Sequence, residues 1–168
     1  MKTLYLVRHA KSSWAAESQP DIDRPLNERG YADAHLMSKH LHKEKCKPEV
    51  IITSPAIRAM STALIFAGNL RYSKEDMLIR ESLYESNKNE YLKNIHSIGN
   101  SFSSAMLFGH NPTMSELAEY LIPRTSLDMP TCCVICIEFE VVSWQEVTKS
   151  GGKLSFNISP ALIKNTIN

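Results

Sequence analysis

Apolar and polar positions follow two different repeats along the chain. Short apolar runs rich in β-branched and aromatic residues predict strands, whereas apolar residues three or four positions apart predict helices. The predicted strands cover residues 3–7, 50–53, 105–108, 133–141 and 153–158. The predicted helices cover residues 28–45, 57–67, 90–98 and 112–121. Because strands and helices alternate, we expect a three-layer α/β/α sandwich with a mostly parallel sheet.

The segments between these elements carry their own signals. Residues 11–27 are polar and contain two prolines, which predicts an irregular loop. The segment from the second helix through Arg80 and Tyr84 is also predicted to be a loop. Gly151–Gly152 predicts a hairpin turn between the last two strands. A chain of 168 residues fits one ordinary domain, so we expect residues 1–168 to form a single domain.

Composition narrows the class of protein. The chain is 43% hydrophobic and 22% charged, with a formal net charge of +1, which is typical of a globular protein. So balanced a charge gives no global attraction to nucleic acid or to an anionic membrane, and neither is expected as a partner. The first apolar run ends at Arg8, too early for a signal peptide, and no run approaches the roughly 20 residues of a membrane span. We therefore expect a cytoplasmic protein.

Four cysteines raise the question of a metal site. Cys132, Cys133 and Cys136 lie in one short run, which is unlike the spread cysteines of a disulfide framework. Cys133 and Cys136 form a C-x-x-C pair, but they fall in a predicted strand, where residues three apart point to opposite faces. We therefore expect no metal site and interpret these cysteines as buried packing residues.

Cationic or potentially cationic residues follow three of the predicted strands. The first strand leads into Arg8–His9, the second into a segment that ends at Arg58, and the third into His110. In a parallel sheet the carboxyl ends of the strands meet at one edge, where α/β proteins bind their ligands. These side chains are therefore expected to converge, although they lie up to about a hundred positions apart in the sequence.

Two of these strand ends also begin helices. Ser54 and Asn111 are good N-cap residues, and the prolines that follow them, Pro55 and Pro112, suit a first helical turn. Helix N-termini add unpaired N–H groups and a positive dipole end to the same edge of the sheet. Together with the arginines and histidines they predict a local site for a doubly charged anion, and phosphate is the obvious candidate.

These motifs resemble those of the histidine phosphatase superfamily, also called phosphoglycerate mutase-like. Arg8-His9-Ala10 is similar to the family's Arg-His-Gly signature, with alanine in third place. The resemblance continues in residues 23–30, in the block around Arg58 and in Gly109-His110-Asn111-Pro112. The short length and the C-terminal segment 156–162 are most similar to the SixA-type phosphohistidine phosphatases.

The resemblance implies the phosphoglycerate mutase-like fold and a role for each motif. His9 would be the nucleophile that becomes phosphohistidine, and water would then hydrolyse this phosphoenzyme. Arg8, Arg58 and a protonated His110 would clamp the phosphoryl oxygens, because arginine offers a fixed fork for phosphate. Hydrogen bonds from Ser12 and Asn111 are expected to assist, as are those of Lys11 and Ser13. The scheme implies neither a metal nor a cofactor.

The general acid is left open by the sequence. Glu85 matches the family's Leu-x-Glu position and would protonate the leaving oxygen. A solvated loop carboxylate explains the same residue equally well. An imidazole leaving group needs this help less than an alkoxide does.

The sequence thus predicts a single catalytic phosphatase domain that acts, without metal, on a phosphohistidine-bearing protein. A small phosphomonoester is the alternative substrate, and a non-catalytic phosphate-binding module is the alternative from a different class. A mutase is disfavoured because the short chain leaves little room for substrate-covering insertions. Trp14 and Trp144 are expected to be packing residues rather than binding platforms. The histidines on or near predicted helices are expected to be surface or packing residues: His35, His40, His42 and His96.

Overall fold

The computed structural model describes residues 1–14, 17–123 and 126–167. Its described residues form a six-stranded sheet in the order β3-β2-β4-β1-β5-β6. The strands are β1 (Lys2–Arg8), β2 (Val50–Thr53), β3 (Leu78–Ile79), β4 (Ser104–Gly109), β5 (Val134–Phe139) and β6 (Gly152–Ile158). The pairs β1–β4, β2–β4 and β2–β3 are parallel, whereas β5 and β6 are antiparallel to their neighbours. The predicted mostly parallel sheet is confirmed.

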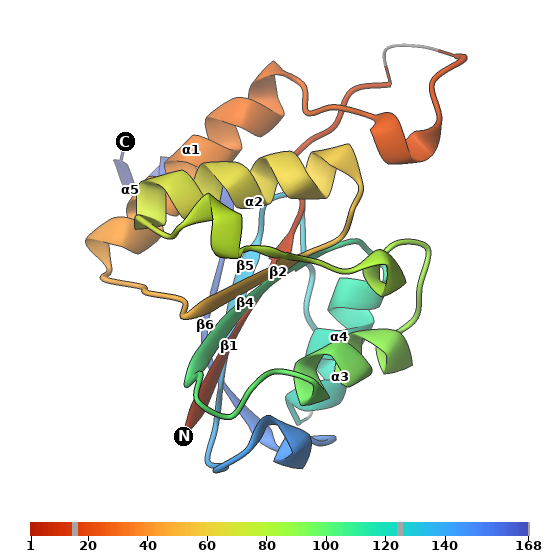
Figure 1. Cartoon of the computed structure of the whole chain (residues 1–168). Helices are drawn as coiled ribbons and strands as arrows, with labels where there is room; N and C mark the ends of the chain where they lie inside the picture. Colours follow the sequence, from red (N-terminus) through yellow and green to blue (C-terminus); the bar gives the residue numbers. More distant parts are fainter. Residues whose placement is uncertain (15–16, 124–125, 168) are drawn as a thin grey trace.

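Helices cover both faces of this sheet. Helices α1 (Glu28–Lys43), α2 (Ile57–Leu70) and α5 (Pro160–Ile167) lie on one face, and α3 (Lys88–His96) and α4 (Thr113–Leu121) lie on the other (Figure 1). The predicted three-layer α/β/α sandwich is therefore confirmed. None of the helices within the described residues is long and apolar enough to cross a membrane.

The sheet separates two apolar cores because side chains alternate along each strand. In β1, Leu4 and Leu6 pack in the core beneath α3 and α4, whereas Tyr5 and Val7 pack in the core beneath α1 and α2. All four side chains are buried. With both faces covered, β1 is an almost unbroken apolar run, as expected for a central strand that is buried on both faces.

The connection between β5 and β6 differs from the prediction. Residues 140–151 form a longer connection with a 3-10 helix at Trp144–Glu146, and Gly152 already belongs to β6, so Gly151–Gly152 is not a tight hairpin turn. The cause is Trp144, which is fully buried and donates its indole N–H to the Phe102 carbonyl at 2.8 Å. Helix α5 and the short strand β3 were also not predicted.

The helix caps differ from the prediction in detail. Helix α2 begins at Ile57 with Ala56 as its N-cap, and the Ser54 hydroxyl accepts a hydrogen bond from the Ala56 N–H at 3.3 Å. Helix α4 begins at Thr113, and the Asn111 side chain accepts from the Ser115 N–H at 3.2 Å. Both side chains therefore bind backbone near a helix start, but neither residue is the N-cap.

The cysteine and tryptophan predictions have different outcomes. Cys133 and Cys136 are buried in opposite cores, as the strand pattern predicts. Trp144 is a packing residue. The prediction for Trp14 was wrong, because its side chain is 78% exposed in the loop after β1.

Candidate active site

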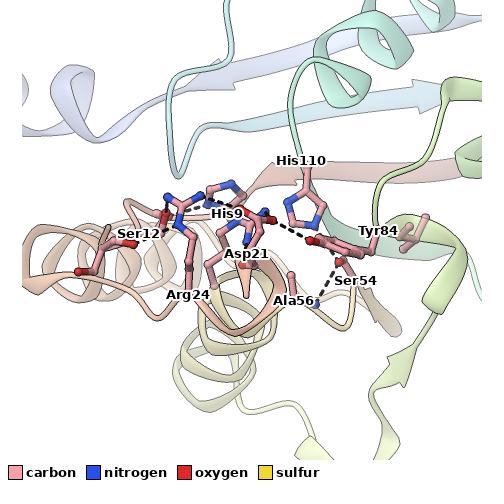
Figure 2. Close-up of polar contacts among 12 residues, drawn as sticks. His9, Ser12, Asp21, Arg24, Ser54, Ala56, Tyr84 and His110 are labelled. Atoms are coloured by element: carbon pink, nitrogen blue, oxygen red, sulfur yellow. Dashed lines mark hydrogen bonds and ion pairs between the residues drawn. The ribbon is translucent and has the colours of Figure 1, made fainter. Parts of the chain in front are cut away.

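The carboxyl ends of β1, β2 and β4 meet, and hydrogen bonds join the residues that follow them. The His9 N–H donates to the Gly109 carbonyl at 3.1 Å, and the Ser54 N–H donates to the Phe108 carbonyl at 3.1 Å. The imidazole rings of His9 and His110 lie with their centroids 5.3 Å apart (Figure 2). Residues a hundred positions apart in the sequence are thus brought into one cluster at this edge of the sheet.

His9 follows β1 directly and is 9% exposed. Its Nδ1 lies 2.7 Å from the Ala10 carbonyl oxygen. A carbonyl oxygen only accepts, so Nδ1 carries the proton and Nε2 keeps its lone pair. Burial, together with the charges of His110, Arg58 and Arg8, lowers the pKa of the His9 ring to about 3, although the bond to Ala10 opposes this shift. At neutral pH the ring is therefore neutral and nucleophilic at Nε2.

The backbone around His9 is fixed by a residue that the sequence did not single out. Thr62 is fully buried in α2, and its hydroxyl accepts the Ala10 N–H at 3.0 Å. The same hydroxyl donates to the Arg58 carbonyl at 2.7 Å. Thr62 thereby connects the residue that holds the His9 ring to the helical turn that carries Arg58.

His110 follows β4, and its Nε2 lies 2.7 Å from the Ser54 hydroxyl oxygen. Within the described residues its buried Nδ1 has no hydrogen-bond partner. Burial lowers the pKa of His110 to about 4, and the neighbouring Arg58 contributes to this shift. Desolvation and an adjacent cation both favour the neutral ring, so the protonated His110 that the family resemblance implies for phosphoryl transfer stays a prediction.

The two predicted arginines approach the histidines from different elements. Arg8 ends β1 and donates from Nη1 to the Met129 carbonyl at 2.9 Å. Its Nε is buried and has no partner among the residues that the structure describes. Arg58, in the first turn of α2, is 7% exposed and donates from Nη1 to the Asp21 carbonyl at 2.8 Å.

Asp21 and Arg24 complete the cluster from the loop that precedes α1. The Asp21 carboxylate accepts from Arg58 at 3.0 Å, from Arg24 at 2.9 Å and from the Tyr84 hydroxyl at 2.7 Å. Figure 2 shows Asp21 between Arg24 and Tyr84. Partial burial opposes ionisation, but the hydrogen bonds from Tyr84 and both arginines hold the pKa of the Asp21 carboxyl well below its usual range. The only sequence signal for this contact was the i, i+3 spacing of Asp21 and Arg24 in a segment expected to be a loop.

Two adjoining cavities open onto this cluster and share Arg58, His110 and Asn111. The His9 cavity, of about 240 Å³, is also lined by Arg8, His9, Ser12, Trp14 and Arg24. The Glu85 cavity, of about 210 Å³, is also lined by Asp21, Tyr84 and Glu85. A larger cavity of about 720 Å³ lies outside this cluster, beside the last turns of α1 and α2.

Ser12 and Asn111 lie in the cluster, but their side chains already have partners. The buried Ser12 hydroxyl accepts from the Arg24 guanidinium at 2.7 Å, so its own proton is free to donate elsewhere. Asn111 donates one amide N–H to the Met129 carbonyl at 3.1 Å. One further N–H of that amide is available to a ligand.

Glu85 lines the cavity of about 210 Å³. It is exposed and adopts a left-handed backbone conformation, with φ of 48°. The preceding segment is tied to the His110 loop by Tyr91, which is buried, donates to the Leu83 carbonyl at 2.9 Å and accepts the His110 N–H at 3.2 Å. Gly109 is required beside this contact, because an added Cβ would collide with the Tyr91 hydroxyl.

Comparison with known families decides the class of protein. Residues 4–97 match the model of the histidine phosphatase superfamily, branch 1. The chain belongs to this superfamily. An uncharacterised chloroplastic protein of Arabidopsis thaliana is 29% identical to this histidine phosphatase over 159 residues, which cover 90% of this chain and 72% of the relative.

Solved structures of SixA-type proteins are similar in fold to this histidine phosphatase. A protein of Agrobacterium tumefaciens described as a candidate phosphohistidine phosphatase, SixA, superposes with a TM-score of 0.82 at 27% identity, covering 95% of this chain and 98% of that one. The protein histidine phosphatase SixA complexed with tungstate shares the fold, with a TM-score of 0.81 at 20% identity over 95% and 97% of the two chains. The phosphoglycerate mutase-like fold that the motifs implied is thereby shown.

The lowered pKa values of this histidine phosphatase predict an unusual titration. The ring NMR signals of His9 and His110 are expected to remain those of neutral imidazole from pH 8 to about pH 5 and to shift only below that, because burial disfavours the charged rings. Single His9→Ala and His110→Ala variants assign the signals. A midpoint near the ordinary value of about 6.5 for either ring in the free protein would contradict this assignment.

Proposed function

We propose that this histidine phosphatase hydrolyses phosphohistidine carried on a protein, without a metal ion and through a phosphohistidine intermediate on His9. The observation that carries the proposal is the neutral His9 ring, whose Nδ1 proton is held by the Ala10 carbonyl at 2.7 Å. Its Nε2 lone pair is therefore preserved in a cavity lined by Arg8 and Arg58.

In the first step, the His9 Nε2 attacks the phosphorus atom of the substrate in line with the leaving group. A new N–P bond forms on His9 as the P–N bond to the substrate imidazole breaks, and that imidazole takes up a proton from solvent. Because His9 is already neutral at physiological pH, no base is needed to activate it.

The phosphoryl oxygens are held by the cationic side chains around His9. The buried Nε of Arg8 has no partner among the described residues, and Arg58 offers a planar fork, so both can bind phosphate oxygens. A bound phosphate dianion also favours the protonated form of His110, which would then add a third positive charge. Ser12 and the free amide N–H of Asn111 are further donors at the edge of the same cavity.

Asp21 sets a condition on phosphate binding. Its carboxylate accepts a hydrogen bond from Nη2 of Arg58 at 3.0 Å. The incoming phosphate must share or displace this contact. A substrate with two negative charges competes better for Arg58 than a singly charged carboxylate does, which favours phosphate over carboxylate ligands.

In the second step, water attacks the phosphorus atom of phosphorylated His9. The P–N bond breaks, inorganic phosphate leaves with the oxygen of the water, whose protons pass to the phosphate or to solvent, and the neutral His9 is restored. The positive charges of Arg8 and Arg58 stabilise the transferring phosphoryl group in both steps, a role that metal ions have in other phosphoryl-transfer enzymes.

The form of the site favours a protein-borne substrate. The His9 cavity is small, about 240 Å³, and Trp14 and Lys11 at its edge are exposed, so a side chain projecting from a partner protein can reach His9. The likeness to SixA, over almost the full length of both chains, agrees with this choice.

A small phosphomonoester is the second candidate, and Glu85 is the observation that favours it. An exposed carboxylate lines the cavity that shares Arg58 and His110 with the His9 cavity, where it could protonate an alkoxide leaving group.

The proposal predicts a substrate preference and an insensitivity to chelators. On two peptides of the same sequence, one phosphorylated on histidine and the other on serine, kcat/KM is expected to be at least about tenfold higher for phosphohistidine, because imidazole is the better leaving group. EDTA is expected to leave both rates unchanged. A preference for phosphoserine would overturn the substrate assignment, and loss of activity in EDTA that one metal restores would overturn the metal-free mechanism.

A further inference from the structure

Trp14 is an aromatic side chain left exposed at the edge of the candidate active site. It is 78% exposed and lines the His9 cavity. An indole buries more apolar area than almost any other side chain when it finds a partner, so a tryptophan left in solvent beside a reactive site indicates a binding surface.

The position of Trp14 is supported from one side by Arg24. The guanidinium carbon of Arg24 lies 3.6 Å from the centroid of the indole ring. Arg24 is itself fixed, because it donates to the Asp21 carboxylate at 2.9 Å, to the Ser12 hydroxyl at 2.7 Å and to the Ser13 carbonyl at 3.1 Å. The indole is therefore held against a rigid support without being covered by it.

The two cavities offer the leaving group different surroundings. On the side of Glu85, the Tyr84 hydroxyl donates to Asp21 at 2.7 Å, and this bond joins the loop before α1 to the segment before α3 (Figure 2). Both residues line the Glu85 cavity, so this hydrogen bond joins two parts of the lining of that cavity. The cavity that contains His9 has Trp14 at its edge instead.

We propose that Trp14 is the platform for the leaving group, on which the imidazole ring of the substrate phosphohistidine stacks while its phosphoryl group passes to His9. This inference rests on the proposed function and adds a residue that selects the substrate class. An imidazole is flat and becomes cationic on protonation, and both properties favour contact with an indole face, whereas an alkyl leaving group has neither. The Asp21 carboxylate, which Arg24 shares with Arg58, offsets part of the charge of Arg24, so the repulsion of a second cation on the indole is reduced.

The test compares leaving groups in variants of Trp14. Trp14→Ala is expected to lower kcat/KM on a phosphohistidine peptide about tenfold, the size of a cation–π contact. The same substitution is expected to change kcat/KM on the phosphoserine peptide of the same sequence less than about twofold, and Trp14→Phe is expected to keep most of the phosphohistidine activity. Val142→Ala is the matched control, because Val142 is 83% exposed in the connection between β5 and β6.

A second measurement separates stacking from an indirect effect through Arg24. The inhibition constant of tungstate, a phosphate-like oxyanion, is expected to be the same in the wild type and in Trp14→Ala. A weaker tungstate inhibition in Trp14→Ala, or equal losses on both peptides, would mean that Trp14 only supports Arg24, and unchanged activity on phosphohistidine would remove its role altogether. Failure of the proposed function looks different, since the wild type would then itself prefer phosphoserine.

Discussion

His9→Ala is expected to lower kcat/KM at least about 10⁴-fold on every phosphorylated substrate, because it removes the atom that forms the bond to phosphorus. The loss is expected to be the same for phosphohistidine and phosphoserine peptides, since the intermediate is common to both. The arginines remain in this variant, so phosphate-like oxyanions should still bind. Steady-state rates together with tungstate binding by calorimetry provide the measurement.

The interpretation of His9→Ala depends on an intact fold. The His9 side chain borders a cavity, and within the described part of the chain its ring has one hydrogen bond, to Ala10, so the sheet does not depend on it. The thermal midpoint is therefore expected to stay close to that of the wild type. His42→Ala, on the exposed face of α1, is a matched control that should retain full activity. Activity near the wild-type level in His9→Ala would refute the assignment of the nucleophile.

Glu85→Gln is expected to separate the two substrate classes. On the phosphoserine peptide the leaving alkoxide is strongly basic, and loss of a general acid costs on the order of a hundredfold in kcat/KM. On the phosphohistidine peptide the leaving imidazole is protonated near neutral pH, so solvent can supply much of the proton that the leaving group needs. The decrease in kcat/KM on this peptide is therefore expected to be less than about threefold. The measurement is kcat/KM for both peptides with both enzymes.

Other outcomes for Glu85 have distinct meanings. Equal small losses on both peptides would show that Glu85 is a solvated loop carboxylate, in keeping with its exposure. Equal large losses would show that Glu85 positions the segment before α3. Glu85 adopts a left-handed backbone conformation in that segment. Glu81→Gln, an exposed carboxylate in the neighbouring 3-10 helix, controls for the change of charge.

The core of the site could be predicted because the sequence shows where the strands end. The apolar run of β1 stops at Arg8–His9, and that of β4 stops at Gly109–His110. The rule that parallel strands present their carboxyl ends at one edge then brings His9 and His110 together without any knowledge of the packing. Arg58 could be placed because it lies in the first turn of the helix after β2.

The surroundings of these residues could not be predicted in the same way. Asp21 and Tyr84 come from loops 63 positions apart in the sequence, and no periodic pattern relates them. The neutral state of His110 depends on burial and on the nearness of Arg58, which only the folded chain provides. Trp14 was expected to pack because tryptophan usually does, and its support by Arg24 depends on the path of the loop.

Trapping the phosphoenzyme tests the central proposal most directly. A peptide carrying radiolabelled phosphohistidine is mixed with the protein and quenched in alkali within one turnover, and the labelled residue is mapped. The label is expected on His9, stable in alkali and lost in acid as a phosphoramidate is, and absent from His9→Ala. Turnover of the phosphohistidine peptide with no label on the protein, or with the label on another residue, would contradict the account.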